Sequence, residues 1–263
     1  MKNTIQNIRR PFFLFCLSII AIGVAPTAAF GQTPTALFQQ ANEDYQNSNF
    51  KQAAEKYDSL LRIGYKSAEL YNNLGNAYYR LGYIAPTILA YERAVLLAPS
   101  DNEIQHNLSI ARSLTADNII PLGESMSDRV INSIGGSLSI GAWSIGAIIF
   151  AWGALILFGL FLYSFRTSAK RWAFYGFILS LLLGIACYGL QKHEESQIKE
   201  NPYSIVTASN VTAKSEPSLS GGDAFSIHEG TKVRVEETLN KWTKIRLADG
   251  KIGWIPSDTA EKI

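Results

Sequence analysis

The side chains that could carry out acid–base or nucleophilic chemistry are scattered along this sequence. Its three histidines lie in three different segments, at His106, His193 and His228. Its two cysteines, Cys16 and Cys187, both lie in apolar runs, so neither soluble region holds a thiol. Catalysis or metal binding needs several such groups at one place. No phosphate-binding glycine loop, Gly-x-Ser-x-Gly element or metal-spaced His and Cys cluster occurs. We therefore expect a non-enzyme without metal or cofactor.

The charged residues point away from nucleic acid as a partner. The net charge is only +2 over 263 residues, and no segment carries the basic stripe that such binding needs. Adjacent acids, at Glu194–Glu195 and Glu236–Glu237, are more typical of solvated surface than of an acid–base pair. The remaining class of function is recognition of another molecule through a binding surface.

The elements that would position such a surface begin with a helical region. Hydrophobic residues make up 47% of the chain but are unevenly spread, which argues against a single globule. Between Thr35 and Asp117 the pattern is helical, and a shift of 34 residues superposes similar side chains. These pairs are Ala41 with Gly75, Tyr45 with Tyr79, Phe50 with Ile84, and Tyr57 with Tyr91. We expect a domain over residues 32–117, with repeats at about 34–67 and 68–101 and a capping helix at 101–114.

The second copy, Tyr71-Asn-Asn-Leu74-Gly75-Asn-Ala-Tyr78 followed by Tyr91, Ala94 and Pro99, resembles the tetratricopeptide repeat. It departs from that pattern at Ser48-Asn49 and at Thr87. The resemblance implies paired helices whose first members line a concave groove.

In this sequence the groove would carry Asn42, Tyr45, Asn72, Asn76, Tyr79 and Arg80, extended by His106. Asparagine amides can hold an extended peptide backbone, and Tyr and Arg are common at the energetic centres of interfaces. The alternative is that the asparagines and tyrosines only satisfy the helix pair.

The N-terminus has the features of a secretory signal peptide. Lys2, Arg9 and Arg10 precede the apolar run 12–24, and small residues follow, with a plausible cleavage site after Ala29 or Gly31. We assign residues 1–31 to this signal. The alternative, an uncleaved anchor helix, would leave the same topology because the positive end stays inside.

Two uncharged apolar segments, residues 143–163 and 172–190, are each long enough to cross a hydrocarbon core of about 30 Å as a helix. We predict a linker and juxtamembrane segment before them, at residues 118–142. The loop between them, residues 164–171, carries Arg166, Lys170 and Arg171 and should be cytoplasmic. We therefore expect a protein of the cytoplasmic (inner) membrane with both soluble domains extracytoplasmic, or periplasmic if the cell has two membranes.

After a connector at residues 191–202, residues 203–263 have the short alternating runs and the Asp249-Gly250 turn of a small all-β barrel. The stretches 211–217, 228–233, 242–246 and 249–256 resemble the bacterial SH3 domain family. Trp242 and Trp254 are candidates for its binding surface, although core or seam positions are the alternative. Both soluble regions are small and lack disulfides, so each should be modestly stable alone, and the repeats should stay folded in a chain truncated after Gln191.

The order of parts, signal peptide, two repeats, membrane hairpin and SH3 domain, resembles the BatE family of Bacteroides aerotolerance operon proteins. The segments 67–82, 229–233 and 253–256 carry this resemblance. It implies partners such as membrane proteins with von Willebrand factor A domains, a MoxR-type AAA ATPase and another repeat protein. It also implies a link to aerotolerance or envelope stress.

Three functions are compatible with this sequence. The first is a membrane-anchored scaffold or adaptor that binds extracytoplasmic proteins. The second is a cell-wall binding protein whose SH3 domain grips peptidoglycan. The third is signalling across the membrane, for which the short cytoplasmic loop offers little surface.

Overall fold

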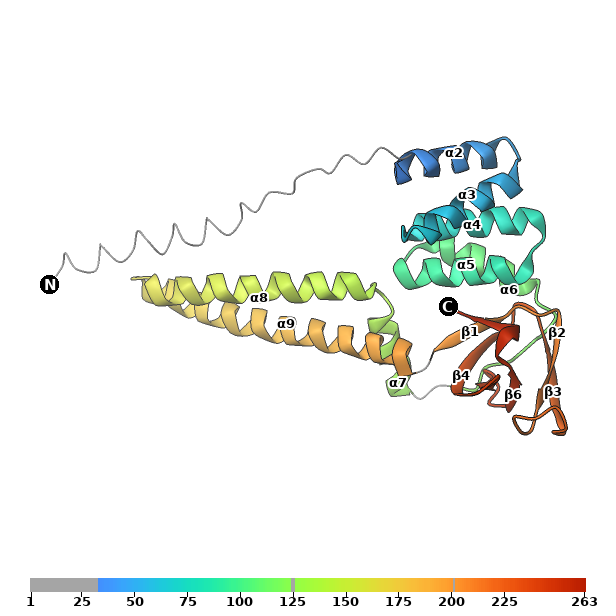
Figure 1. Ribbon diagram of the computed structural model, residues 1–263. Coiled ribbons are helices and arrows are strands. Elements are labelled where there is room, and N and C mark those ends of the chain that lie inside the picture. The colour runs from blue at the N-terminus through green and yellow to red at the C-terminus, as the bar shows by residue number, and fades with distance from the viewer. Residues whose placement is uncertain (1–32, 124–125, 201) are drawn as a thin grey trace. The chain divides into compact units, whose positions relative to one another are not determined.

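A computed structural model describes residues 33–123, 126–200 and 202–263 (Figure 1). The signal peptide predicted for residues 1–31, with Cys16, lies outside the described residues.

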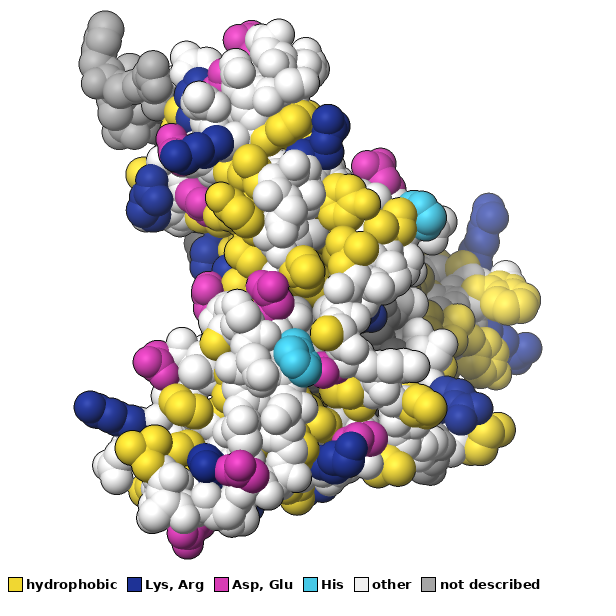
Figure 2. Space-filling view, turned by 90° about the vertical axis from the view of Figure 1, so that its right-hand side faces the viewer, with side chains coloured by type: hydrophobic (Ala, Val, Ile, Leu, Met, Phe, Trp, Pro, Cys, Tyr) yellow, Lys and Arg dark blue, Asp and Glu magenta, His cyan; other side chains and the backbone are white. Residues whose placement is uncertain are grey.

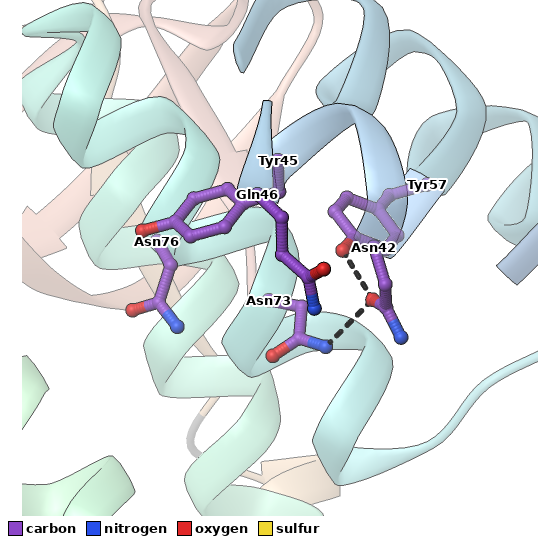
Figure 3. A pocket seen from close by; sticks show the side chains of 6 residues that line it. All are labelled: Asn42, Tyr45, Gln46, Tyr57, Asn73 and Asn76. Carbon is purple, nitrogen blue, oxygen red and sulfur yellow. Dashed lines mark hydrogen bonds between the residues drawn. The ribbon is translucent and has the colours of Figure 1, made fainter. Parts of the chain in front are cut away.

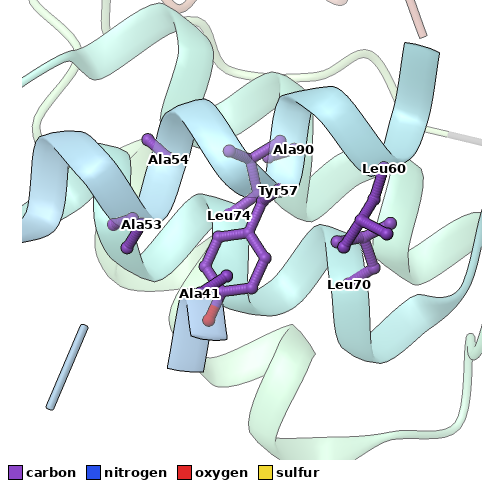
Figure 4. Close-up of a cluster of buried hydrophobic side chains, with 9 residues drawn as sticks. Ala41, Ala53, Ala54, Tyr57, Leu60, Leu70, Leu74 and Ala90 are labelled. Atoms are coloured by element: carbon purple, nitrogen blue, oxygen red, sulfur yellow. The ribbon is translucent and has the colours of Figure 1, made fainter. Parts of the chain in front are cut away.

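The first part of the described chain is helical. Its helices are α2 (Pro34–Gln46), α3 (Phe50–Arg62), α4 (Ala68–Leu81), α5 (Ile84–Leu97) and α6 (Asn102–Ser113). Each helix packs on the next one along the chain, as Figure 1 shows for α2 to α5. The first buried cluster joins α2, α3, α4 and α5, and Figure 4 shows Tyr57 at its centre among alanines and leucines. The helical region expected from the 34-residue pattern is thus confirmed.

Local sequence signals set several of these helix ends. The Ser67 hydroxyl accepts a hydrogen bond from the Leu70 N–H, and Asp101 caps α6 in the same way through the N–H groups of Glu103 and Ile104. Gly82 ends α4 with a φ of 77°, a left-handed conformation that side chains other than glycine rarely adopt.

The close packing of α4 on α5 depends on Gly75. A Cβ atom at Gly75 would lie 2.6 Å from Cε1 of Tyr91, so only glycine lets the tyrosine ring cross α4 here. The same ring sends its hydroxyl to Asn76, one residue further along α4. The seam between the two helices therefore positions a polar side chain as well as filling the core.

Two long apolar helices follow α7 (Met126–Gly135). They are α8 (Ile140–Tyr163) and α9 (Thr167–Glu200). The most apolar stretches of α8 and α9 are only 6% and 11% buried, which is unlike the core helix of a soluble protein and compatible with membrane spans. The two helices pack along one another, and the Ser180 hydroxyl donates to the Phe150 carbonyl at 2.8 Å.

These helices extend further than hydropathy indicates. α9 includes most of the loop predicted at residues 164–171 and of the connector predicted at 191–202, and α7 lies within the predicted linker 118–142. Hydropathy shows where a run of apolar residues ends. A helix, in contrast, continues as long as its backbone hydrogen bonds form. An ion pair at i,i+3 between Lys192 and Glu195, with a distance of 2.8 Å, supports the polar end of α9.

The C-terminal part is an antiparallel sheet, as expected. Its strands are β1 (Tyr203–Val206), β2 (Asn210–Lys214), β3 (Asp223–His228), β4 (Lys232–Leu239), β5 (Trp242–Arg246), β6 (Ile252–Pro256) and β7 (Ala260–Lys262). Within residues 202–263 they lie in the order β3-β2-β6-β5-β4-β1-β7, and a short 3-10 helix, η2 (Ser257–Thr259), precedes β7. Alternate residues such as Ile245 and Ile255 point into a separate buried core.

The helical region and the sheet share a buried cluster. Ile205 of β1 belongs to the same cluster as Ile88 and Tyr91 of α5 and Leu108 of α6. A Cβ atom at Gly230 would lie 2.8 Å from Cδ1 of Ile88, so the turn before β4 also touches α5. This shared core runs against the expectation that the repeats fold without the C-terminal region.

Two carboxylates join the same parts. Glu92 of α5 is 4% exposed and pairs with Arg112 of α6 at 2.5 Å and Lys232 of β4 at 2.8 Å. Asp117, which follows α6, accepts from the His228 backbone N–H at 2.7 Å and the Thr231 hydroxyl at 2.5 Å.

The ionisation of these carboxylates follows from their partners. Burial acts to raise the pKa of Glu92, but Lys232 and Arg112 together outweigh it and hold that pKa below its ordinary value. Burial also opposes ionisation of Asp117, while hydrogen bonds from Thr231 and His228 lower its pKa overall. Both side chains are therefore carboxylates at neutral pH, each held by donors from the sheet.

The shared cluster predicts that Ile205→Ala loosens the helices as well as the sheet. Deleting this buried side chain should cost about 2–5 kcal/mol and speed amide hydrogen exchange in α5 and α6 of the full chain. Ile255→Ala is the matched control, because Ile255 is equally buried but lies in the separate core of the sheet. Unchanged exchange in α5 and α6 of the Ile205 variant would show that the two parts do not support each other.

The carboxylates predict that acid weakens the contact between α5, α6 and the sheet. Their pKa values are lowered on folding, so their stabilisation is present above their unfolded pKa values of about 4 and is lost as pH falls through the folded values. The melting temperature of wild type should therefore drop more between pH 6 and pH 3 than that of Asp117→Asn, which cannot titrate there. An equal drop in both proteins would refute the role given to Asp117.

Candidate functional site

A cavity of about 240 Å³ opens on the helical region between α2, α3 and α4. Its lining residues, drawn in Figure 3, are Asn42, Tyr45, Gln46, Tyr57, Asn73 and Asn76. All six are uncharged and polar or aromatic. We call this cavity the amide groove, since four of its six side chains end in an amide.

Tyrosine hydroxyls fix the orientation of two of these amides. The Tyr57 hydroxyl donates to Oδ1 of Asn42 at 2.5 Å, and Nδ2 of Asn73 donates to the same oxygen at 3.2 Å (Figure 3). The Tyr91 hydroxyl donates to Oδ1 of Asn76 at 2.7 Å. With their oxygens occupied, Asn42 and Asn76 each keep an amide NH2 group that can donate to a ligand.

The tyrosines remain donors at any physiological pH. Burial, the largest cause, raises the pKa of Tyr57 to about 12, and burial also raises the pKa of Tyr91. Their protons therefore stay in place, and the amide orientation does not change with pH in the neutral range. The groove presents hydrogen-bond donors without a net charge, which suits the carbonyl oxygens of a peptide backbone.

The structure brings together some of the predicted groove residues and separates others. Asn42, Tyr45 and Asn76 line the amide groove. Asn72 is 8% exposed and its Oδ1 accepts from Asn107 of α6 at 3.2 Å, so it joins two helices instead of facing a ligand. The contacts of Asn72 therefore fit the alternative given above, in which the asparagines satisfy the helix packing and bind no ligand.

The remaining predicted residues lie outside the lining of the amide groove. Tyr79 is 42% exposed, on the last turns of α4. The Arg80 guanidinium stacks over the Phe50 ring, 4.2 Å from its centroid, and His106 lies on α6. Arg80 thus holds the start of α3 against α4 by a cation–π contact.

Sequence reasoning missed Gln46, Tyr57 and Asn73 as lining residues. In the sequence Tyr57 belongs only to the repeat pattern, although its hydroxyl is what orients Asn42. Asn73 follows Asn72 directly, and a one-residue difference in helical phase decides which of the two is buried. The spacing of Asn73 and Asn76, three residues apart on one helix face, could have indicated the pair.

The two tryptophans proposed for the barrel surface lie on neighbouring strands, Trp242 on β5 and Trp254 on β6, and both are half-buried. In the strand register Trp254 stands between Lys214 of β2 and Lys244 of β5. Both tryptophans line part of the sheet surface rather than its buried core.

The His, Cys, Asp and Glu side chains are dispersed over the described parts of the chain. Within residues 33–123, 126–200 and 202–263, no three His, Cys, Asp or Glu side chains come together in a way that could hold an ion.

The charges on the surface are mixed in sign. On the face drawn in Figure 2, Lys and Arg side chains alternate with Asp and Glu side chains over both the helices and the sheet. This distribution agrees with the small net charge of +2 and gives this face no basic stripe for nucleic acid.

The hydroxyl that orients Asn42 should contribute measurably to stability. We expect Tyr57→Phe to lower the free energy of unfolding of the helices by about 0.5–1.5 kcal/mol, because one hydrogen bond is lost while Asn73 still serves the Asn42 oxygen. Tyr45→Phe is the matched control, since its hydroxyl makes no hydrogen bond to the described residues. Denaturant unfolding followed by circular dichroism measures both, and equal effects would contradict this role for Tyr57.

Comparison with known families identifies one part of the chain. The sequence model of the bacterial SH3 domain matches residues 209–261, which span β2 to β7. No curated protein matches the sequence. Strand β1, which supplies Ile205 to the shared cluster, precedes the matched region. The chain therefore carries a bacterial SH3 domain at residues 209–261.

Proposed function

We propose that this protein is a non-enzymatic, membrane-anchored scaffold whose helical region binds an extended segment of a partner protein. The observation that carries the proposal is the amide groove, in which Asn42 and Asn76 have their oxygens occupied and their NH2 groups available. An extended peptide offers carbonyl oxygens that such donors match, without any need for charge.

The helical region supports this function through its resemblance to tetratricopeptide repeats. α2 with α3 and α4 with α5 are successive helix pairs, and the groove lies on the first helices of the two pairs, α2 and α4, with Tyr57 of α3 at its edge. In tetratricopeptide domains this surface receives peptides.

The membrane anchor would be the hairpin of α8 and α9. Arg166, Lys170 and Arg171 lie at the connection between the two helices, and a positive connection is retained in the cytoplasm. This orientation places the amide groove and the SH3 domain together on the extracytoplasmic side of the inner membrane, or in the periplasm of a cell with two membranes. A signal peptide at residues 1–31 would deliver the chain in the same orientation.

The partners follow from the resemblance of the whole arrangement to the BatE family. They would be membrane proteins with von Willebrand factor A domains, in a Bat-type envelope complex linked to aerotolerance or stress. The groove residues carry no redox chemistry, so any contribution to aerotolerance would come through assembly of partners.

A cell-wall binding protein is the alternative function. The bacterial SH3 domain at residues 209–261 favours it, because domains of this family bind proteins or peptidoglycan. In this case the SH3 domain would hold peptidoglycan and the helices would recruit a second protein.

The scaffold can be tested by affinity purification of the full chain in mild detergent, followed by mass spectrometry. The informative variant is Asn42→Asp with Asn76→Asp, because a carboxylate still accepts from Tyr57 and Tyr91 but has no NH2 group to donate. We expect it to recover at least tenfold less partner, since a lost donor that costs about 1.4 kcal/mol weakens binding tenfold.

The control is Asn47→Asp with Asn102→Asp, which adds the same charge at exposed sites outside the groove lining. Equal loss in both double variants would assign the effect to charge and exclude the amide groove. Recovery of wall fragments or wall enzymes without any membrane partner would replace the scaffold by the cell-wall function, which sedimentation with purified sacculi would then measure directly.

A further inference from the structure

A second cavity, of about 340 Å³, lies on the SH3 domain where the segment after α6 passes over it. Its polar wall consists of Tyr203, Lys232, Arg234 and Arg246, and Pro121 and Leu122 cover one side. We call this cavity the arginine pocket. It shares no lining residue with the amide groove, so the two are separate sites.

The strand register explains why these side chains meet. Arg234 of β4 stands directly opposite Tyr203 of β1 on one side and Arg246 of β5 on the other. The three residues form a row across neighbouring strands, with side chains on the same face of the sheet. Two arginines directly opposite one another repel, so this arrangement costs stability unless an anion lies between them.

The carboxylates beside the pocket do not fully neutralise it. Glu236 is shared between Arg246, at 2.6 Å, and Lys244, at 3.7 Å. The buried Glu92 is likewise shared between Lys232 and Arg112. Each carboxylate thus faces two cations, which leaves the pocket with an excess of positive charge.

Arg234 is the cation with no acidic partner among the described residues. Its Nη2 donates to the Tyr203 hydroxyl at 3.3 Å, and its Cζ lies 5.7 Å from the centroid of that ring. On the same ring Lys232 lies 4.6 Å from the centroid. The tyrosine ring therefore contacts two cations beside the cavity, of which Lys232 is paired with Glu92 and Arg234 has no carboxylate partner among the described residues.

The other walls of the pocket are apolar, and three of their backbone N–H groups are occupied. The Leu122 N–H donates to the Ala248 carbonyl at 2.9 Å, the Leu247 N–H to Lys251 and the Gly250 N–H to Leu247. A phosphate site is commonly built from several unoccupied backbone N–H groups, and these three are already occupied. The pocket instead pairs one planar guanidinium fork with an apolar wall, which suits a carboxylate next to an apolar side chain.

We propose that the arginine pocket binds the terminal carboxylate of a peptide, with Arg234 as the anchoring residue. The carboxylate lies between Arg234 and Arg246, and the last side chain of the peptide packs against Leu122 and Leu247. The volume of about 340 Å³ fits such a chain end. This site stands independently of the function proposed for the amide groove.

Calorimetric titration of the full chain in detergent tests this proposal. The probes are N-acetylated tripeptides that end in Ala, Leu or Phe, each as the free acid and as the amide. We expect binding of free acids that weakens at least tenfold on amidation, and at least tenfold in Arg234→Gln. Arg234→Lys should recover only part of the affinity, because it keeps the charge and loses the fork.

Two control variants distinguish binding at the arginine pocket from a general effect of charge and from binding at the amide groove. Lys241→Gln removes one positive charge from an exposed turn outside the lining and should leave the affinity unchanged. The variant with Asn42→Asp and Asn76→Asp should bind the tripeptides normally, so failure of the amide groove and failure of the arginine pocket are distinguishable.

Thermal melting gives a second readout that a purely structural role for Arg234 would not produce. Removing one of two opposed arginines should raise the melting temperature of the unliganded Arg234→Gln protein, and the peptide should no longer raise it further.

Several results would overturn the proposal. They are equal binding of acids and amides, no binding of any tripeptide up to its solubility limit, and a lower melting temperature of Arg234→Gln. Preference for an amidated phosphoserine peptide would reassign the pocket to phosphate. Arg234-dependent adsorption to phosphatidylglycerol vesicles without peptide binding would reassign it to a lipid surface.

Discussion

The buried carboxylate of Glu92 is the constraint on which the arrangement of the described parts depends. A charge this deep in the protein is very unfavourable unless both of its oxygens have cationic partners, and here the two partners come from different regions. Arg112 belongs to α6 and Lys232 belongs to β4. The last helices of the helical region, α5 and α6, must therefore meet the SH3 domain for the Glu92 charge to be compensated. Ile205 belongs to the same buried cluster as Ile88 of α5, and it lies opposite Lys232 in the strand register.

The geometry of both candidate sites depends on this contact of α5 and α6 with the SH3 domain. The Asp117 bonds to His228 and Thr231 direct the segment after α6 along the SH3 domain, and this segment then covers the arginine pocket with Leu122. Lys232 contributes to the pocket with the same ammonium group that neutralises Glu92. The amide groove depends on the same helix, because Tyr91, which precedes Glu92 in α5 and packs against Gly75 of α4, also orients Asn76. The packing of α5 against α4 therefore connects the amide groove with the contact between α5 and the SH3 domain.

The sequence predicts those features that depend on local pattern. The helical region, the two apolar helices and the all-β region all follow from periodicity, turn residues and hydropathy. What it does not predict depends on partners far along the chain. Asn72 is buried because Asn107 of α6 satisfies its amide, which leaves Asn73 for the groove. Arg234 gains a role only once the register places it opposite Arg246, and no spacing in the sequence encodes that pairing. The sequence predicts a shorter helix than α9, because hydropathy reports apolar residues rather than helical backbone.

The two cavities differ in the physical basis of recognition, and this difference bears on what a scaffold could assemble. Asn42 and Asn76 offer neutral donors fixed by tyrosine hydroxyls, so binding there would depend on backbone geometry and change little with salt. The arginine pocket is defined by uncompensated charge, so ions in solution screen its attraction for a carboxylate. One site therefore suits an internal, extended stretch of a partner, and the other suits a chain end. A protein with both could hold two ligands that do not compete, because neither site meets the chemical requirement of the other.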